Sequence, residues 1–173
     1  MIIIEERFEE MIDVIPEMGN PPTSTDKFKV KFSFGDDKEL TSYLINNKSN
    51  VYPLIWLIYP IIENHTLKKV DLPEASFILA VQTNNYLSNK ERFATNYKNV
   101  LIPLYNNFIE LMQKSNIINM AESKKVIKYP NYSNENNDKE NKTVDIWDAI
   151  KVTISCNLTD AYFRKSIKFN NNI

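Results

Sequence analysis

The chain has very little glycine, with only Gly19 and Gly35 among its 173 residues. Loops that cradle phosphate groups need several glycines, because the backbone must approach the phosphate closely and adopt conformations that other residues resist. Neither a G-x-x-x-x-G-K-[ST] loop nor a G-x-G-x-x-G turn occurs in the sequence. The shortage therefore excludes the common glycine-rich nucleotide-binding motifs.

Histidine and cysteine are equally scarce, since His65 and Cys156 are the only residues of their kinds. Structural zinc sites usually combine several such ligands, so the usual zinc sites are excluded. A single cysteine cannot form a disulfide within the chain, which fits a reducing compartment. The alternating pattern around Cys156 predicts a buried, inert thiol. Nothing around His65 indicates a nucleophile elbow, so we expect an ordinary turn or surface histidine.

Neither sign of charge dominates, and no apolar run is long. The 21 basic and 22 acidic residues leave a net charge of −1, so no overall positive field attracts DNA or an acidic membrane. No window reaches the roughly 18 apolar residues that a membrane helix needs. With 43% hydrophobic and 25% charged residues, we expect one soluble domain over residues 1–173 and no membrane partner.

The most apolar segment is residues 51–62, "VYPLIWLIYPII". It shows no alternation, which favours a strand buried on both faces or buried against a partner. Pro53 and Pro60 cannot donate hydrogen bonds to a neighbouring strand, so they are predicted to mark its two ends. The residues between the two prolines, "LIWLIY", are then predicted to form the strand.

Hydrophobic periodicity predicts the other elements. Helices are predicted at residues 3–17, at 36–47 with Asp36 or Asp37 as the cap, and at about 99–114 after a partly ordered segment. Strands are predicted near residues 27–34, 65–72, 75–84, 124–132 and 144–158, with a last one in the tail at 163–173. In the first strand, Phe28, Val30, Phe32 and Phe34 are predicted to share the buried face. This order indicates an α+β fold with a mainly antiparallel sheet flanked by two or three helices.

A polar insert at about residues 131–142, "NYSNENNDKENK", separates the last two main strands. It contains no aliphatic side chain, and such a segment has too little apolar surface to join a core. The insert is predicted to be either disordered or the tip of a projecting hairpin.

Carboxylates are the remaining candidates for catalytic chemistry. The acids that a metal-dependent nuclease would have to gather are Asp71, Glu74, Asp145, Asp148 and Asp160. No Asp…Glu-x-Lys spacing on adjacent strands stands out, so solvated acids at turns or strand ends are the favoured interpretation. We predict no catalytic, cofactor-binding or metal-binding residue and no enzyme activity, with a small metal-dependent nuclease as one alternative.

A second alternative comes from the basic residues Lys124, Lys125 and Lys128, which flank an apolar strand. Aromatic residues make up 12% of the chain, and single-stranded nucleic acids stack on aromatic side chains. The near-neutral net charge favours a core face and a solvated face instead. A monomeric nucleic-acid-binding accessory protein stays open as the second alternative.

Four segments together resemble small structural proteins of tailed bacteriophages. They are "NVYPLIWLIYP", "ASFILAVQTN", "FATNYKNVLIPLYNNFIELM" and "DIWDAIKVTI". An N-terminal helix, strands, a helix packed across the sheet and a late strand pair follow one another along the chain. This order is similar to that of tail-terminator and head–tail connector proteins, in particular those of phages that infect Bacteroidetes, crAss-like phages among them.

The resemblance implies a structural virion protein that forms a ring of six or twelve copies in the neck or at the tail end. Its partners would be copies of itself and adjoining portal, neck or tail proteins, and genomic DNA would pass through the ring without specific binding. Assembly would take place in the host bacterial cytoplasm. The insert at 131–142 would reach a neighbouring ring or tube. The expected subunit-interface residues are Tyr52, Trp56, Tyr59, Tyr129, Tyr132 and Trp147.

Overall fold

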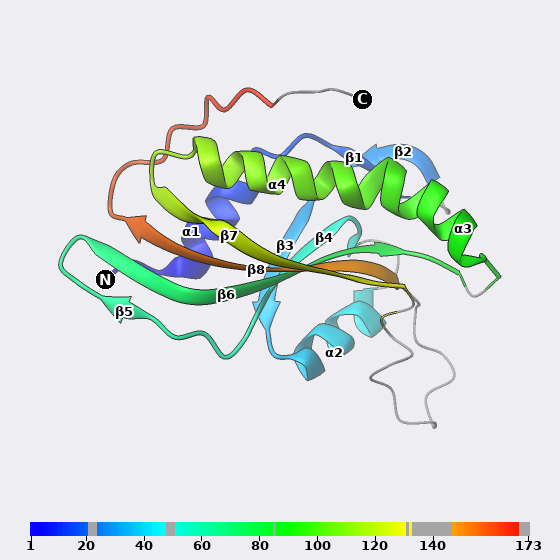
Figure 1. Cartoon of the computed structure of the whole chain (residues 1–173), viewed down its shortest axis with the longest axis horizontal. Coiled ribbons are helices and arrows are strands. Elements are labelled where there is room, and N and C mark those ends of the chain that lie inside the picture. Colours follow the sequence, from blue (N-terminus) through cyan, green and yellow to red (C-terminus); the bar gives the residue numbers. More distant parts are fainter. Residues whose placement is uncertain (21–23, 48–50, 85, 131, 133–146, 170–173) are drawn as a thin grey trace.

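The computed structural model describes residues 1–20, 24–47, 51–84, 86–130, 132 and 147–169. These residues form an α+β fold around a mixed six-stranded sheet, with α4 above the sheet and α2 below it in Figure 1. The helices are α1 (Ile4–Ile12), α2 (Asp37–Asn47), α3 (Asn89–Arg92), the π-helix η2 (Phe93–Leu101) and α4 (Ile102–Lys114). The strands are β1 (Met18–Asn20), β2 (Ser24–Phe28), β3 (Lys31–Gly35), β4 (Leu54–Ile58), β5 (Asn64–His65), β6 (Lys69–Gln82), β7 (Ile118–Tyr129) and β8 (Trp147–Thr159).

The main sheet has the strand order β3-β4-β6-β8-β7, and β5 pairs with one end of β6. Strands β3 and β4 run parallel, while the other neighbours run antiparallel. The predicted α+β class, with a mainly antiparallel sheet flanked by helices, is confirmed. Strands β1 and β2 form a separate two-stranded sheet.

Strand β4 is the buried centre of one half of the sheet, as the apolar segment predicted. Leu54, Ile55 and Leu57 are 0% exposed and Trp56 is 2% exposed. Pro53 and Pro60 lie just outside the two ends of the strand, where a missing N–H breaks no hydrogen bond of the sheet.

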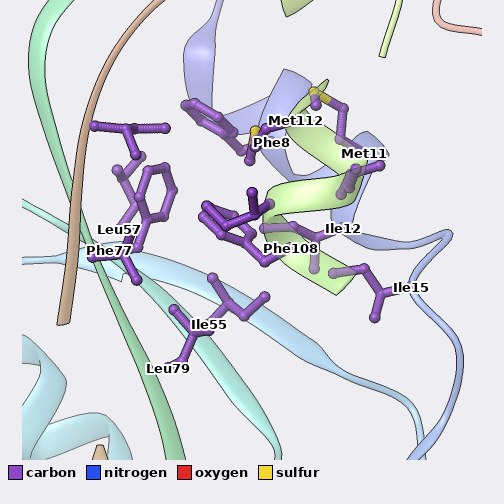
Figure 2. Close-up of a cluster of buried hydrophobic side chains, with 14 of the residues drawn as sticks. Phe8, Met11, Ile12, Ile15, Ile55, Leu57, Phe77, Leu79, Phe108 and Met112 are labelled. Carbon is purple, nitrogen blue, oxygen red and sulfur yellow. The ribbon is translucent and has the colours of Figure 1, made fainter. Parts of the chain in front are cut away.

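Two hydrophobic cores lie on opposite faces of the sheet. The larger core fills the space between the sheet and the helices α1 and α4, as Figure 2 shows. Its centre is a run of three aromatic rings, with centroids 5.0 Å apart between Phe8 and Phe77 and 4.9 Å apart between Phe77 and Phe108. The smaller core lies under α2, which contributes Leu40 and Leu44. Both faces of the central strands are therefore removed from water.

The helix that crosses the sheet begins ten residues before the predicted start near residue 99. Ser88 caps α3 in a reciprocal capping box with Glu91, and α3, η2 and α4 then follow without a break up to Lys114. The spacing S-x-x-E is a sequence signal for this start that the hydrophobic pattern does not contain. Pro103 lies in the first turn of α4, where the π register gives way to the α register, so its missing N–H falls at an existing interruption.

The single alternating strand predicted near residues 27–34 is wrong. The chain leaves the small sheet after Phe28 and enters the main sheet at Lys31, whose N–H donates to the Pro53 carbonyl at 2.9 Å. Phe28 and Phe34 are 39% and 45% exposed, whereas Val30 is buried. The change of sheet interrupts the shared face that a continuous strand would have given these residues.

The two strands predicted at 65–72 and 75–84 also need correction, because the single strand β6 spans the second half of the first and most of the second. A bulge between Leu72 and Ala75 places both of these side chains in the core. Residues 66–68 form the turn between the short strand β5 and β6.

Both ends of the chain differ from the predicted elements. The first helix ends at Ile12 rather than at residue 17, and its last turn tightens through a bond of 2.9 Å from the Ile15 N–H to the Ile12 carbonyl. The described tail forms no strand, but the fully buried Phe163 anchors it. A hydrogen bond also holds the backbone of the tail, because the Arg164 N–H donates to Asn116 Oδ1 at 3.0 Å. The insert at 131–142 lies outside the described residues except for Tyr132.

The aromatic run predicts a large difference between two phenylalanines of the crossing helix. Phe108→Ala removes a fully buried ring and should lower the free energy of unfolding by about 3–5 kcal/mol. Phe93→Ala, at a position that is 50% exposed, is the matched control and should cost less than about 1 kcal/mol. Urea unfolding followed by circular dichroism measures both, and equal losses would contradict the packing described.

The buried thiol predicts a dependence of stability on alkaline pH. Burial raises the pKa of Cys156 to about 12 from an ordinary value of 9.0. Between these two values the unfolded chain binds fewer protons than the folded chain, so unfolding becomes more favourable as the pH rises. The wild-type protein should therefore lose stability more steeply above pH 9 than Cys156→Ala, by at most about 1.4 kcal/mol per pH unit. Urea titrations at a series of alkaline pH values test this, and identical slopes would contradict it.

Candidate interaction edge at strand β7

Most of the aromatic residues expected at a subunit interface lie inside the smaller core. Tyr52, Trp56, Tyr132 and Trp147 are 2%, 2%, 8% and 1% exposed, and Tyr129 packs against the same cluster. Helix α2 covers this face of the sheet, so these rings have their packing partners within one chain. They therefore present little surface to a second chain.

Tyr59 lies apart from this group, at the end of β4 near the larger core. Its ring is partly buried, and its hydroxyl donates to the carboxylate of Glu5 on α1. Tyr59 thus ties the N-terminal helix to the sheet.

Strand β7 is the long exposed edge of the main sheet. It has 12 residues and pairs with β8 on one side, while no other described strand pairs with its second side. Its burial pattern is mostly exposed or intermediate beyond Ile118. A strand in this position presents a row of backbone N–H and C=O groups that have no partner in the sheet.

Positive charge is concentrated along this edge. We define the basic edge as Lys124, Lys125 and Lys128 of β7 together with Lys151 of β8. Lys125 pairs with Thr153 and Ile127 pairs with Lys151 in the register of the two strands. Side chains alternate between the faces of a strand, so Lys124 and Lys128 project from one face and Lys125 and Lys151 from the other. None of these four lysines forms an ion pair within the part of the chain that the structure describes.

Exposed apolar groups accompany the lysines. Phe93 and Val126 are 50% and 41% exposed. The ammonium group of Lys128 lies 5.7 Å from the ring centroid of Phe93 and 6.0 Å from that of Tyr97, within the range of a cation–π interaction. The two rings are stacked, with centroids 6.5 Å apart and an interplanar angle of 18°. The edge therefore combines unpaired backbone, cationic side chains and a small apolar surface.

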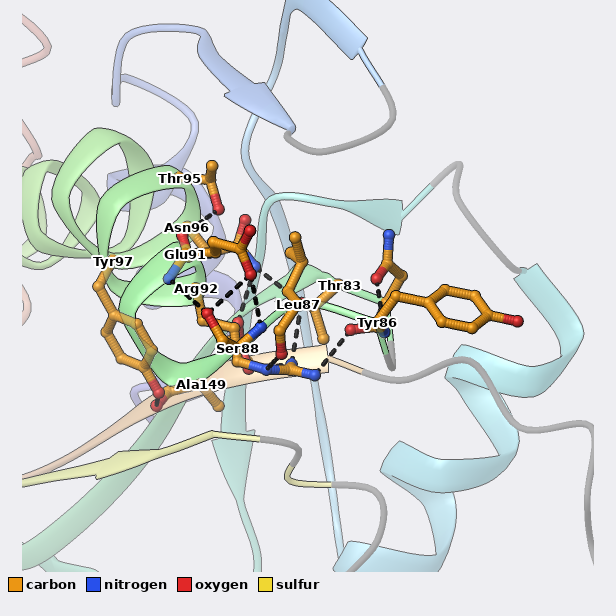
Figure 3. Close-up of polar contacts among 12 residues, drawn as sticks. Thr83, Tyr86, Leu87, Ser88, Glu91, Arg92, Thr95, Asn96, Tyr97 and Ala149 are labelled. Atoms are coloured by element: carbon orange, nitrogen blue, oxygen red, sulfur yellow. Dashed lines mark hydrogen bonds and ion pairs between the residues drawn. The ribbon is translucent and has the colours of Figure 1, made fainter.

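A buried polar cluster fixes the crossing helix beside this edge, as Figure 3 shows. The guanidinium group of Arg92 donates to Asp148 Oδ1 and to Thr83 Oγ1, both at 3.0 Å, and to the Asn84 carbonyl at 2.7 Å. Asn96 Nδ2 donates to Asp148 Oδ2 at 2.7 Å and to Thr83 Oγ1 at 2.8 Å. Arg92 is 2% exposed and Asp148 is 0% exposed. The cluster joins the helix to β8 and to the end of β6 without reaching solvent.

The electrostatic effect of the cluster extends to Tyr97. Burial raises the pKa of the Tyr97 phenol, the nearby Asp148 carboxylate raises it further, and Arg92 acts in the opposite direction. The phenol therefore stays protonated and donates to the Ala149 carbonyl at 3.3 Å. This bond is a second link between the helix and β8.

The interpretation of Asp148 as a solvated acid at a strand end is wrong. The carboxylate is fully buried because Arg92, which lies 56 positions away in the sequence, neutralises it. No short-range sequence pattern indicates an ion pair between residues so far apart, so the sequence analysis did not predict the pairing of Arg92 with Asp148. Asp145, its neighbour in the sequence, lies outside the described residues.

The other chemical candidates lie at the surface and apart. His65 is in β5, with its Nε2 atom 2.7 Å from Glu63 Oε2 at the protein surface. Within the described ranges, no three His, Cys, Asp or Glu side chains come together in an arrangement suited to a metal ion. Among the same residues, no helix has the length and hydrophobicity needed to cross a bilayer.

Two surface hollows accompany the ends of the sheet. One, of about 470 Å³, lies where bulges in β6 and β7 flank the same part of β8, and its lining includes Pro73, Ala121 and Ser155. The other, of about 440 Å³, lies beside α1 and includes Glu6, Glu10 and Leu67.

Comparison of the chain with protein-family models, curated proteins and solved structures finds no significant match.

The buried ion pair predicts strong coupling between Arg92 and Asp148. Arg92→Met leaves the carboxylate buried without its cation and should lower the free energy of unfolding by about 3–5 kcal/mol, and Asp148→Leu should cost a similar amount. The double variant Arg92→Met/Asp148→Leu should lose much less free energy of unfolding than the two single variants added together, because it leaves no buried charge without its partner. Urea unfolding of the four proteins completes the thermodynamic cycle. Strictly additive losses would contradict the pairing.

Proposed function

We propose that this chain is a structural subunit that assembles with copies of itself into a ring, at the head–tail interface or tail end of a tailed phage. The observation that carries the proposal is the 12-residue edge strand β7, which is paired on one side only among the described strands. Such an edge is a template for strand addition by another chain.

The charge of β7 favours a ring over a two-fold dimer. Two β7 strands laid side by side would bring together the lysines of both basic edges, and this repulsion opposes a symmetric contact. A contact between unlike surfaces avoids the repulsion. Repeated by rotation, such a head-to-tail contact closes into a ring or continues as a filament.

The place in a virion rests on the resemblance to tail-terminator and head–tail connector proteins. The confirmed α+β class agrees with it, because an N-terminal helix, a helix across the sheet and the late strand pair β7–β8 occur in the implied order. In this proposal the adjoining portal, neck or tail proteins bind the faces of the ring. Genomic DNA passes through the central channel, and the ring assembles in the host bacterial cytoplasm.

One observation favours a second candidate function. The exposed ring of Phe93 beside Lys128 is the combination on which single-stranded nucleic acid stacks. In that case the protein would be a monomeric nucleic-acid-binding accessory protein. No arrangement of carboxylates in the described residues adds comparable support to a nuclease.

Native mass spectrometry with sedimentation velocity tests the ring. The subunit has a mass of 20.3 kDa, and we expect wild-type species of six or twelve copies. Val126→Asp places a charge in the exposed apolar part of β7 and should raise the dissociation constant at least about tenfold. Tyr162→Asp, at an 80% exposed position on the tail, is the matched control and should assemble as the wild type does.

Two results would contradict the structural function. One is a wild-type protein that stays monomeric at every concentration and binds single-stranded DNA with an affinity that falls steeply with salt. The other is the absence of the protein from purified phage particles. The first result would favour the nucleic-acid-binding alternative.

A further inference from the structure

We infer that the partner of the basic edge is the opposite edge of a second copy of this chain, formed by helix α1 and strand β3. The inference rests on the proposed self-assembly and names the surface that completes it. Strands β3 and β7 are the two outer strands in the order β3-β4-β6-β8-β7. A contact between them would join the end of one sheet to the beginning of the next.

Helix α1 places acidic side chains at this second edge. We define the acidic edge as Glu6, Glu9, Glu10 and Asp13 of α1 and the turn that follows it. Helix α1 packs against β3, and Glu9 and Asp13 line a hollow of about 180 Å³ with Lys29, Lys31 and Phe32. The hollow shows that Glu9 and Asp13 share one surface with the outer strand, whereas Glu6 and Glu10 line the hollow on the other side of α1, with Leu67.

Part of the acidic edge has no cation of its own. Glu10 pairs with Arg7 at 3.4 Å, and Asp13 pairs with Lys29. Glu6 and Glu9 are exposed and form no ion pair within the residues that the structure describes. The four lysines of the basic edge also form no ion pair among the described residues. Glu6 and Glu9 of α1 and the lysines of the basic edge are therefore charges of opposite sign without an ion pair, and Lys31 of β3 is a cation that lines the same hollow as Glu9.

Exposed apolar groups also occur at both edges. On β3, the 45% exposed ring of Phe34 lies 5.7 Å from the ring of Tyr59 and 6.4 Å from that of Phe32, measured between centroids. On the other edge, Phe93 and Val126 are exposed. A contact between the two edges would bury these groups at its centre and leave the charges around them, which is the usual arrangement of a protein interface.

The attraction between the two edges is electrostatic at its periphery, so it depends on salt. At 1 M salt the screening length is about 3 Å, shorter than most separations between exposed charges. Self-association should therefore weaken as salt is added, which is the reverse of the trend for a purely apolar contact.

Charge reversal tests the pairing of the edges. The first variant, Lys124→Glu/Lys128→Glu, makes the basic edge acidic, and the second, Glu6→Lys/Glu9→Lys, makes the acidic edge basic. Each alone brings like charges together and should raise the dissociation constant of self-association at least about tenfold. A control with a reversed charge elsewhere, Lys38→Glu on α2, should assemble as the wild type does.

Restoration is the decisive measurement. A chain with all four edge substitutions has both charges exchanged and should assemble again. An equal mixture of the two double variants should also assemble, because one chain is acidic and the other basic at both edges, so they can alternate around an even-numbered ring. Sedimentation velocity of each sample and of the mixture, after urea unfolding has confirmed a native fold, gives the result.

The outcomes separate this inference from the function on which it rests. If Glu6→Lys/Glu9→Lys assembles normally while the lysine variant does not, β7 has a different partner and the inference is wrong, although the chain still self-assembles. The pairing of the two edges is equally wrong if neither the four-substitution chain nor the mixture recovers. A wild-type chain that never assembles would overturn the proposed function and the inference together.

Discussion

The burial of both faces of strand β4 and of the adjacent half of β6 is the constraint on which the rest of the structure depends. Four consecutive side chains of β4 are at most 2% exposed, so the sheet needs a cover on each side. Helices α1 and α4 supply the cover on one face and α2 supplies it on the other. With both faces occupied near β4, the exposed parts of the sheet are its two edges and the polar face beyond α2. The candidate interaction surfaces lie at those edges for this reason.

The polar cluster around Arg92 has a consequence for the β7 edge. Burying an ion pair costs desolvation energy, and the cost is recovered only when every polar group is well placed. Here Arg92 donates to four oxygen atoms of Asp148, Thr83, Asn84 and Leu87. The pair therefore sets the position of the helix on the sheet, and with it the position of Phe93 and Tyr97 beside Lys128. A structural ion pair in the interior thus organises a surface.

Patterns that depend on near neighbours in the sequence predicted much of the fold. The uninterrupted apolar run between Pro53 and Pro60 predicted a strand covered on both faces, and the cap at Asp36 predicted the start of α2, where Asp36 Oδ1 accepts from the N–H groups of Lys38 and Glu39. The predicted start of the crossing helix near residue 99 is too late, because Pro103 is accommodated inside a continuous helix where the π register of η2 gives way to α4. Periodicity failed at Phe28 and Phe34, because the chain changes sheets between them.

The sequence by itself determined the α+β class, the buried strand β4, the inert thiol of Cys156 and the absence of glycine-rich phosphate loops. Each of these follows from residue type or from spacings of a few positions. Only the tertiary structure decided that Trp56 and Trp147 belong to the core, that Asp148 pairs with Arg92, and that β7 and β3 are the outer strands. These facts depend on which segments, distant in the sequence, lie side by side. The order of the strands and the placement of the helices determine those contacts. The same order places the acidic residues of α1 near β3 and three of the lysines of the basic edge on β7.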